Sequence, residues 1–268
     1  MRNSAVFVQY IISFPSASLS AGRFFLYITR YRRMREMNTE IFNGFGKNAR
    51  EFFRELAEHN NKNWFLENRY RYDDEILEPA VAFVSSLGAG LKEMYRDLNY
   101  STLRNGSGSV MRLYRDIRFS PDKRPYKVNL GLILWIGEGK KVELPCFYFH
   151  LDASRIFFYG GQHQFPADVL ERFRAAVDDG ERGPALEKIL GVLEKQGLLL
   201  MEEPKYKRVP RGYPADHPRA DLLRLSGLGV GTDIPFKMAA ESGLVDLCGG
   251  YARQMAPLIE WLKPLNRL

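Results

Sequence analysis

The sequence predicts an α+β fold, in which a mainly antiparallel sheet of about four to six strands is packed by helices from the N- and C-terminal parts. Apolar residues recur at helical spacing before residue 96 and after residue 166, and they alternate or run continuously between residues 110 and 159. The links between these central segments are too short for the crossovers of a parallel sheet. Together these observations favour an antiparallel meander flanked by helices.

The formal net charge of +7 is concentrated at the start of the 268-residue chain. Residues 1–36 contain six arginines and one glutamate, a net charge of +5, which leaves +2 for the other 232 residues. A basic protein invites a nucleic-acid interpretation, but the body of this one is close to neutral. Residues 1–36 are expected to lie outside the core, as an early translation start or a targeting segment, and residues 37–268 to form a single α+β domain.

Cysteine usage indicates a reducing compartment. Cys146 and Cys248 are far apart among apolar neighbours, so each is predicted to be a buried free thiol. The chain has neither a disulfide framework nor a paired-cysteine metal signature, and the predicted location is therefore cytoplasmic. No apolar run approaches the roughly 18 residues needed to cross a membrane.

Helices are predicted on both sides of the sheet. The first starts near Lys47 and stops at Asn60–Asn61. A long amphipathic pattern follows over residues 64–95, and Pro79 within it predicts a kink or two abutting helices. Beyond the sheet, prolines in the first helical turn predict two further helices, which begin near Pro166 and Pro184. Apolar spacing predicts two more, over residues 219–225 and 243–262.

The strands are predicted from alternation and from turn residues between them. Residues 110–119 alternate apolar and polar side chains, with a bulge or strand end expected near Arg115, where the apolar face is broken. A turn with two prolines follows. The remaining predicted strands are residues 127–136, 142–151 and 155–159, with another extended piece at 228–234.

The stretch from Met111 to Lys127, MRLYRDIRFSPDKRPYK, is the strongest candidate for a working site. It sets six cations against two acids, Asp116 and Asp122. Guanidinium groups bind phosphate and carboxylate in bidentate fashion, so the cluster predicts anion recognition. An Arg–Asp network that closes over a loop is the alternative. The expected ligand-binding residues are Arg112, Tyr114, Arg115, Arg118, Lys123 and Lys127, joined by Asn61 and Trp64.

Other polar residues have competing interpretations. Asn61 and Trp64 could recognise a base or sugar, although helix capping is the common use of asparagine. His217 could be a general acid or a structural capping residue. The four histidines are scattered, without the spacing of a metal site. We therefore predict no metal and no cofactor, and we take Asp116, Asp122 and His217 as the candidate catalytic residues.

Three blocks stand out along the chain: FFRELAEHNNKNWF at 52–65, RLYRDIRFSPDKRPYK at 112–127 and KRVPRGYPADHPRADLL at 207–223. The middle block carries a signature readable as R-D-x-R-F-S-x-D-K-x-P-Y-K. In these blocks the chain resembles a family of conserved hypothetical proteins defined by a domain of unknown function. The resemblance runs from about residue 42 to residue 261 of one compact domain, leaves residues 1–36 outside, and implies no particular activity.

The function predicted from the residues is binding of a phosphate-bearing ligand, a nucleotide or a nucleic-acid end, through the basic segment. Processing of a phosphoester or nucleotide is the enzymatic version, so whether the protein is an enzyme stays open. The alternative is a non-enzymatic module whose basic turn docks an acidic protein partner. A concave site walled by Tyr114, Trp64 and arginines would favour the small ligand, whereas a flat exposed turn would favour the protein.

Overall fold

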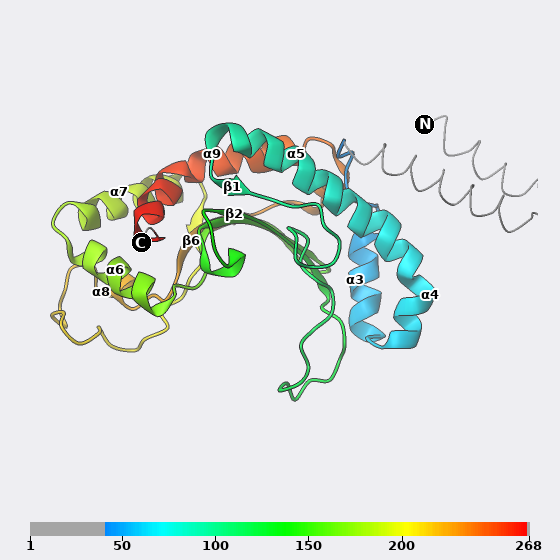
Figure 1. Cartoon of the computed structure of the whole chain (residues 1–268), viewed down its shortest axis with the longest axis horizontal. Helices are drawn as coiled ribbons and strands as arrows, with labels where there is room; N and C mark the ends of the chain where they lie inside the picture. Colours follow the sequence, from blue (N-terminus) through cyan, green and yellow to red (C-terminus); the bar gives the residue numbers. More distant parts are fainter. Residues whose placement is uncertain (1–40, 267–268) are drawn as a thin grey trace, which may run out of the picture. The chain divides into compact units, whose positions relative to one another are not determined.

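The computed structural model describes residues 41–266. The expectation for residues 1–36 therefore concerns residues outside the described part. The described residues belong to one compact unit, Glu40–Leu268. They confirm the predicted α+β class, with one antiparallel sheet and helices that come from both ends of the unit (Figure 1).

The sheet has six strands in the order β1-β2-β3-β4-β6-β5, and every neighbouring pair is antiparallel. The three central strands confirm the predicted meander. Two edge strands of two residues each were not predicted, because so short a segment shows no periodicity. The strands are β1 Leu98–Asn99, β2 Asn129–Ile136, β3 Cys146–Asp152, β4 Ile156–Gln162, β5 Leu199–Leu200 and β6 Leu228–Asp233.

The N-terminal helices confirm the predicted break at Pro79. A π-helical turn, η1, separates two α-helices, and Pro79 lies in the first turn of the second one. The π-helical turn has its C-cap immediately before Pro79, at Glu78, whose backbone N–H donates to the carbonyl of Asp73. The elements are α3 Ala49–Glu58, α4 Lys62–Tyr72, η1 Asp73–Leu77 and α5 Glu78–Met94.

The C-terminal helices also match their predictions. Pro166 is the N-cap of one helix and Pro184 lies in the first turn of the next. The α-helices are α6 Ala167–Asp178, α7 Arg182–Lys195, α8 Ala220–Leu223 and α9 Leu244–Leu262. Short 3₁₀ turns are η2 Lys141–Glu143, η3 Phe236–Ala240 and η4 Lys263–Asn266.

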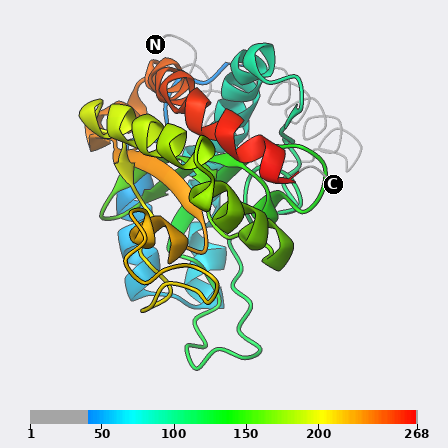
Figure 2. The same ribbon diagram turned by 90° about the vertical axis from the view of Figure 1, so that its left-hand side faces the viewer.

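Helices α5 and α9 pack against one face of the sheet, and this interface forms the main core (Figures 1 and 2). Phe149 on β3 lies at its centre, with ring centroids 5.6 Å from Phe45 and 4.9 Å from Phe83. All three rings are buried. Aromatic rings at these separations add to the stability gained from apolar burial.

The opposite face of the sheet carries a second, smaller apolar cluster. Its buried members are Ile133, Cys146 and Tyr159. The absence of a side chain at Gly131 leaves room for the Tyr148 ring on this face, since a Cβ at Gly131 would lie 2.6 Å from the Tyr148 hydroxyl. The tyrosine can therefore lie close over β2. The smaller cluster is completed by Met111, Trp135, Tyr148, Phe157 and Met201.

The predicted strand at residues 110–119 is wrong. The described residues form only isolated bridges there, Val110 to Leu132 and Tyr114 to Tyr126. Side chains of the segment bind its own backbone: Asp116 accepts a hydrogen bond from the N–H of Arg118, and Asp122 accepts one in the same way. Such local bonds compete with the strand ladder. The segment instead runs as a loop that extends away from the sheet (Figures 1 and 2).

Replacing Asp152 should reveal a pH-dependent part of the stability. Burial acts to raise the pKa of Asp152, but hydrogen bonds from His150, Ser154 and the backbone of Arg155 outweigh it and lower the pKa to about 2. Because the folded pKa is depressed, the carboxylate stabilises the fold above its unfolded pKa near 3.8, and the effect is lost as pH falls towards 2.

We expect Asp152→Asn to lower the free energy of unfolding by about 1.5 kcal/mol at pH 7. Denaturant titrations from pH 7 to pH 2 should show the native and variant curves converge at the acid end. A difference that stays constant over this range would show that the charge of Asp152 contributes nothing.

Candidate functional site

The basic segment, Met111–Lys127, contains two groups of paired arginine and aspartate side chains. Arg118 binds Asp116 through two nitrogens, at 3.0 and 2.7 Å. Arg115 reaches Asp122 at 2.6 Å, and Arg124 binds the same carboxylate at 2.8 Å. The hydrogen bonds from Arg118 lower the pKa of Asp116 to about 2, and those from Arg124 and Arg115 lower that of Asp122 further. Both acids are therefore charged partners of arginine at neutral pH.

Three cations of the segment have no carboxylate partner in the described part of the chain, and of these only Lys123 has another one, the carbonyl of Ile117. Neither the guanidinium of Arg112 nor the ammonium of Lys127 forms a hydrogen bond or ion pair with another described residue. Burial lowers the pKa of Lys127, and the nearby charge of Arg112 lowers it further. Asp116 senses the charge of Arg112 but is bound to Arg118. No carboxylate among the described residues therefore forms an ion pair with either cation.

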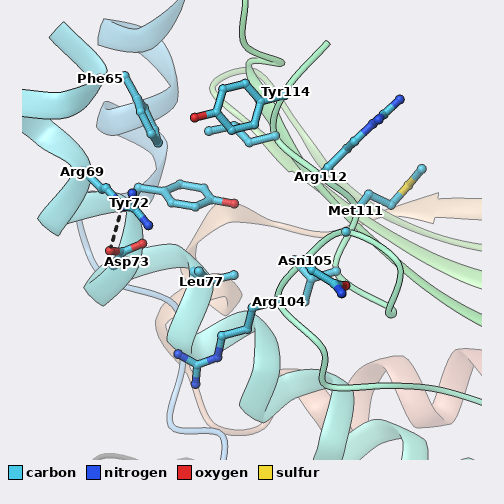
Figure 3. Close-up of a pocket in the computed structure, with 13 residues that line it drawn as sticks. Phe65, Arg69, Tyr72, Asp73, Leu77, Arg104, Asn105, Met111, Arg112 and Tyr114 are labelled. Carbon is cyan, nitrogen blue, oxygen red and sulfur yellow. Dashed lines mark hydrogen bonds and ion pairs between the residues drawn. The ribbon is translucent and has the colours of Figure 1, made fainter. Parts of the chain in front are cut away.

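A cavity of about 270 Å³ lies between the η1 end of α4 and residues 104–114 (Figure 3). Phe65, Tyr72 and Tyr114 give it aromatic walls. The hydroxyl of Tyr72 points into the space, and the Arg112 stem lines one side while its guanidinium extends outward (Figure 3). Burial raises the pKa of Tyr72 to about 12, so its hydroxyl is a neutral donor.

Three arginines contribute to the lining of this cavity, against one aspartate, Asp73. Arg69 contacts Asp73 at 3.4 Å, a long and exposed ion pair. Arg104 forms a bidentate ion pair with Glu78, in which the Arg104 Nη2 to Glu78 Oε2 distance is 2.7 Å. Arg112 is left with its charge unmatched. The cavity therefore combines aromatic surface with one unmatched positive charge at its edge, where the Arg112 guanidinium extends outward.

Asn61 and Trp64 do not line the cavity. Asn61 is the N-cap of α4 and accepts a hydrogen bond from the backbone N–H of Trp64 at 3.0 Å, the capping role that its residue type favours. The Trp64 ring packs beside Phe52 and His59. Their role in ligand recognition remains a prediction.

The neighbouring Asn60 joins this turn to the basic segment. Its side chain donates to the carbonyl of Tyr126 at 2.9 Å and accepts from the Tyr126 N–H at 3.0 Å. Tyr126 in turn packs against Phe65 and Tyr114, with ring centroids 4.4 and 5.1 Å away. These hydrogen bonds and ring contacts fix the aromatic wall of the cavity relative to α3 and α4.

His217 belongs to another part of the fold. Its Nδ1 accepts a hydrogen bond from the backbone N–H of Arg219 at 3.0 Å, so Nε2 carries the proton and donates to Asp178 on α6 at 3.1 Å. The side chain is buried, and no contact joins it to the described part of the basic segment. The structure thus does not bring His217 together with Asp116 and Asp122.

Lys123 also has a local role, because its ammonium donates to the carbonyl of Ile117 at 3.0 Å. Of the predicted binding residues, Arg112 and Tyr114 line the cavity and Lys127 lies near Arg112. The sequence interpretation missed Arg69, Tyr72, Arg104 and Asn105, which come from distant segments. The sequence shows Tyr72 in a helical pattern and Asn105-Gly106 in a loop, but nothing in the spacing of these residues predicts that they meet the basic segment.

Among residues 41–266, no three potential ligands of the His, Cys, Asp and Glu types gather as a metal site would require. His150 pairs with Asp152, whereas His163 lies near Glu202 beyond the opposite end of β3. No helix in the described part is long and apolar enough to cross a membrane.

Comparison with known proteins identifies the family. A family model described as conserved hypothetical protein (DUF2461) matches residues 48–261, a range that holds the cavity and the whole basic segment. No match was found among curated proteins or solved structures. That residues 112–127 are the mark of the family stays a prediction. The matched range covers most of the chain, and the protein therefore belongs to the DUF2461 family of conserved hypothetical proteins.

Proposed function

We propose that the protein binds a small phosphate-bearing ligand, such as a nucleotide or a nucleic-acid end, at the cavity beside Arg112. The observation that carries this proposal is that Arg112, whose stem lines the cavity, and Lys127, whose pKa the charge of Arg112 lowers, have no ion pair or side-chain hydrogen bond among the described residues. An anion between or beside them would relieve the repulsion of two like charges. It would also accept charge-assisted hydrogen bonds, which are about twice as strong as neutral ones.

The aromatic walls support a ligand that has a flat or apolar body as well as a phosphate. Phe65, Tyr72 and Tyr114 offer ring surface, and the Tyr72 hydroxyl offers a neutral donor. A volume of about 270 Å³ suits one small molecule or a single nucleotide unit. Arg69 would supply a further cation on the α4 side, since its pair with Asp73 is long.

The proposal extends to binding and stops short of a reaction. A general acid or base works best when its pKa lies near the operating pH. Asp116, with a pKa of about 2, and Asp122, lower still, are fixed as carboxylates by their arginines. Phosphoester or nucleotide processing would need a proton-transfer group from elsewhere, because His217 contacts α6 instead.

Thermal-shift screening against nucleotides, sugar phosphates and oligonucleotides tests the proposal. We expect at least one of these classes to raise the melting temperature of the native protein, since a ligand at 100 times its dissociation constant adds about 2.7 kcal/mol of stability. Arg112→Ala combined with Lys127→Ala should abolish this shift. Arg118→Ala combined with Lys123→Ala removes the same charge and should retain it.

Loss of the shift in both double variants would mean that only net charge matters, and absence of a shift with every ligand class would reject the proposal.

A second candidate, docking of an acidic protein, is favoured by the exposed tip of the basic segment. Phe119 is 93% exposed there, beside the 77% exposed side chain of Arg118. Binding of an acidic peptide that depends on Arg118 and Lys123, and not on Arg112, would support this alternative.

A further inference from the structure

A second cavity, of about 350 Å³, lies on the sheet face that carries the smaller apolar cluster. Aromatic and thioether side chains form much of its wall, among them Tyr148, Phe157 and Met201. One acidic and one basic side chain also line it, Glu202 and His163. The cavity involves neither Arg112 nor Lys127, although Met111 lines both this cavity and the one beside Arg112.

Glu202 is the unusual member of this wall, because its side chain is only 8% exposed. It follows β5, where the N–H of Met201 continues the pairing with β6 by donating to Gly229 at 3.0 Å. One oxygen, Oε1, accepts a hydrogen bond from the Tyr159 hydroxyl at 2.7 Å and lies 3.5 Å from His163 Nδ1. The other oxygen, Oε2, is buried and has no hydrogen-bond partner among the described residues.

An unpartnered buried carboxylate oxygen is costly. Leaving one buried polar atom unsatisfied costs about 1–3 kcal/mol, and more when the group is charged. Native proteins therefore satisfy nearly all such atoms. The contacts of Glu202 also affect its neighbours: its hydrogen bond raises the pKa of His163, and burial together with the proximity of Glu202 raises the pKa of Cys146 to about 12.

We propose that this cavity binds a small aromatic or apolar amine, whose protonated nitrogen pairs with the Glu202 carboxylate in the cavity wall while its body lies against Tyr148, Phe157 and Met201. A group that pairs with this carboxylate must offer a hydrogen-bond donor, because a carboxylate can only accept. The surrounding rings favour a cation, which is attracted to the face of an aromatic ring. Thioether side chains adapt to apolar bodies of irregular shape.

The Tyr159 hydroxyl would position the carboxylate for this ligand. Burial and the charge of Glu202 raise the pKa of Tyr159 well above its usual value, so the phenol keeps its proton and donates to Oε1. The carboxylate is thereby fixed in the wall of the cavity. The His163 ring, whose side chain is 84% exposed, lies at the rim, 3.5 Å from Oε1 of the same carboxylate.

Isothermal titration of the full chain with benzylamine tests the proposal, with benzyl alcohol as the neutral analogue of the same size. We expect benzylamine to bind at least about tenfold more tightly than benzyl alcohol. Glu202→Gln should remove this preference and leave the melting temperature unchanged or raised, since replacing a buried charge by a neutral group of similar shape removes its desolvation cost.

Glu203→Gln is the matched control, because it makes the same charge change at an exposed neighbour outside the cavity. It should bind benzylamine as the native protein does. Equal binding of amine and alcohol, no binding of benzylamine at millimolar concentrations, or equal losses in the two glutamine variants would each overturn the proposal. The variant with Arg112→Ala and Lys127→Ala should keep the amine preference, which separates this site from the proposed phosphate site.

Discussion

Gly161→Ala is expected to destabilise the protein by about 3 kcal/mol or more, through overpacking and an unfavourable backbone conformation. Gly161 pairs with Gly229 across the β4–β6 ladder. A Cβ at this position would lie 2.3 Å from the Cα of Gly229 and 2.4 Å from the carbonyl oxygen of Leu228, and the φ of +155° already favours glycine. Because these obstacles are backbone atoms, β4 and β6 would have to separate.

Gly191→Ala provides the control for this experiment. Gly191 lies in α7, and a Cβ there meets no atom within 4 Å. The same substitution should therefore stabilise the protein by up to about 1 kcal/mol through helix propensity. Denaturant unfolding of both variants measures the difference. Equal stabilities would contradict the close packing of β4 against β6.

Phe149→Ala should lower the free energy of unfolding by about 3–5 kcal/mol, the usual cost of truncating a buried aromatic residue. Phe149 is fully buried and contacts Phe45 and Phe83, so its ring joins β3 to the helical layer and to the segment before α3. The surrounding elements cannot all collapse into the space left behind. A large loss of stability follows.

Phe119→Ala is the matched control for the core variant, since the Phe119 side chain is 93% exposed. Its unfolding free energy should stay within about 0.5 kcal/mol of the native value. Chemical denaturation with the two variants in parallel measures the contrast. A loss below 1 kcal/mol for Phe149→Ala would show that the ring is not the central contact between sheet and helices.

Most of the fold could be predicted because its elements are long and periodic. The pattern over residues 127–159 indicates the β2–β3–β4 meander, and Pro79 indicates the break between α4 and α5. Two-residue strands such as Leu98–Asn99 are too short to show a period. Residues 110–119 alternate like a strand, yet Asp116 and Asp122 bond to the local backbone and the ladder does not form.

The candidate site was only partly predictable. Charge density singled out the segment around Arg112, but composition does not show which cations find acids. The structure pairs Arg115 and Arg118 and leaves Arg112 and Lys127 unpaired. Tyr72 reaches the same cavity from a helix about 40 residues earlier. Such a meeting depends on tertiary packing, which no local pattern encodes.

The environment of Glu202 was even less predictable from the local sequence. Its surroundings in the sequence, MEEPK, resemble an exposed polar loop. Only the pairing of Met201 with β6 turns the carboxylate inward, towards Tyr159 on β4. The adjacent Glu203 is exposed. Two identical neighbouring residues thus have opposite environments, for a reason that lies in the sheet register.

The central claim, a phosphate site at Arg112 and Lys127, is tested most directly by the dissociation constant of phenyl phosphate, measured by isothermal titration at constant ionic strength. We predict that Arg112→Ala with Lys127→Ala weakens binding by at least about tenfold, or 1.4 kcal/mol. Arg118→Ala with Lys123→Ala should change it by no more than about twofold, because both side chains are exposed and locally bonded. Equal weakening by the two double variants, or no measurable binding of phenyl phosphate by the native protein, would contradict the claim.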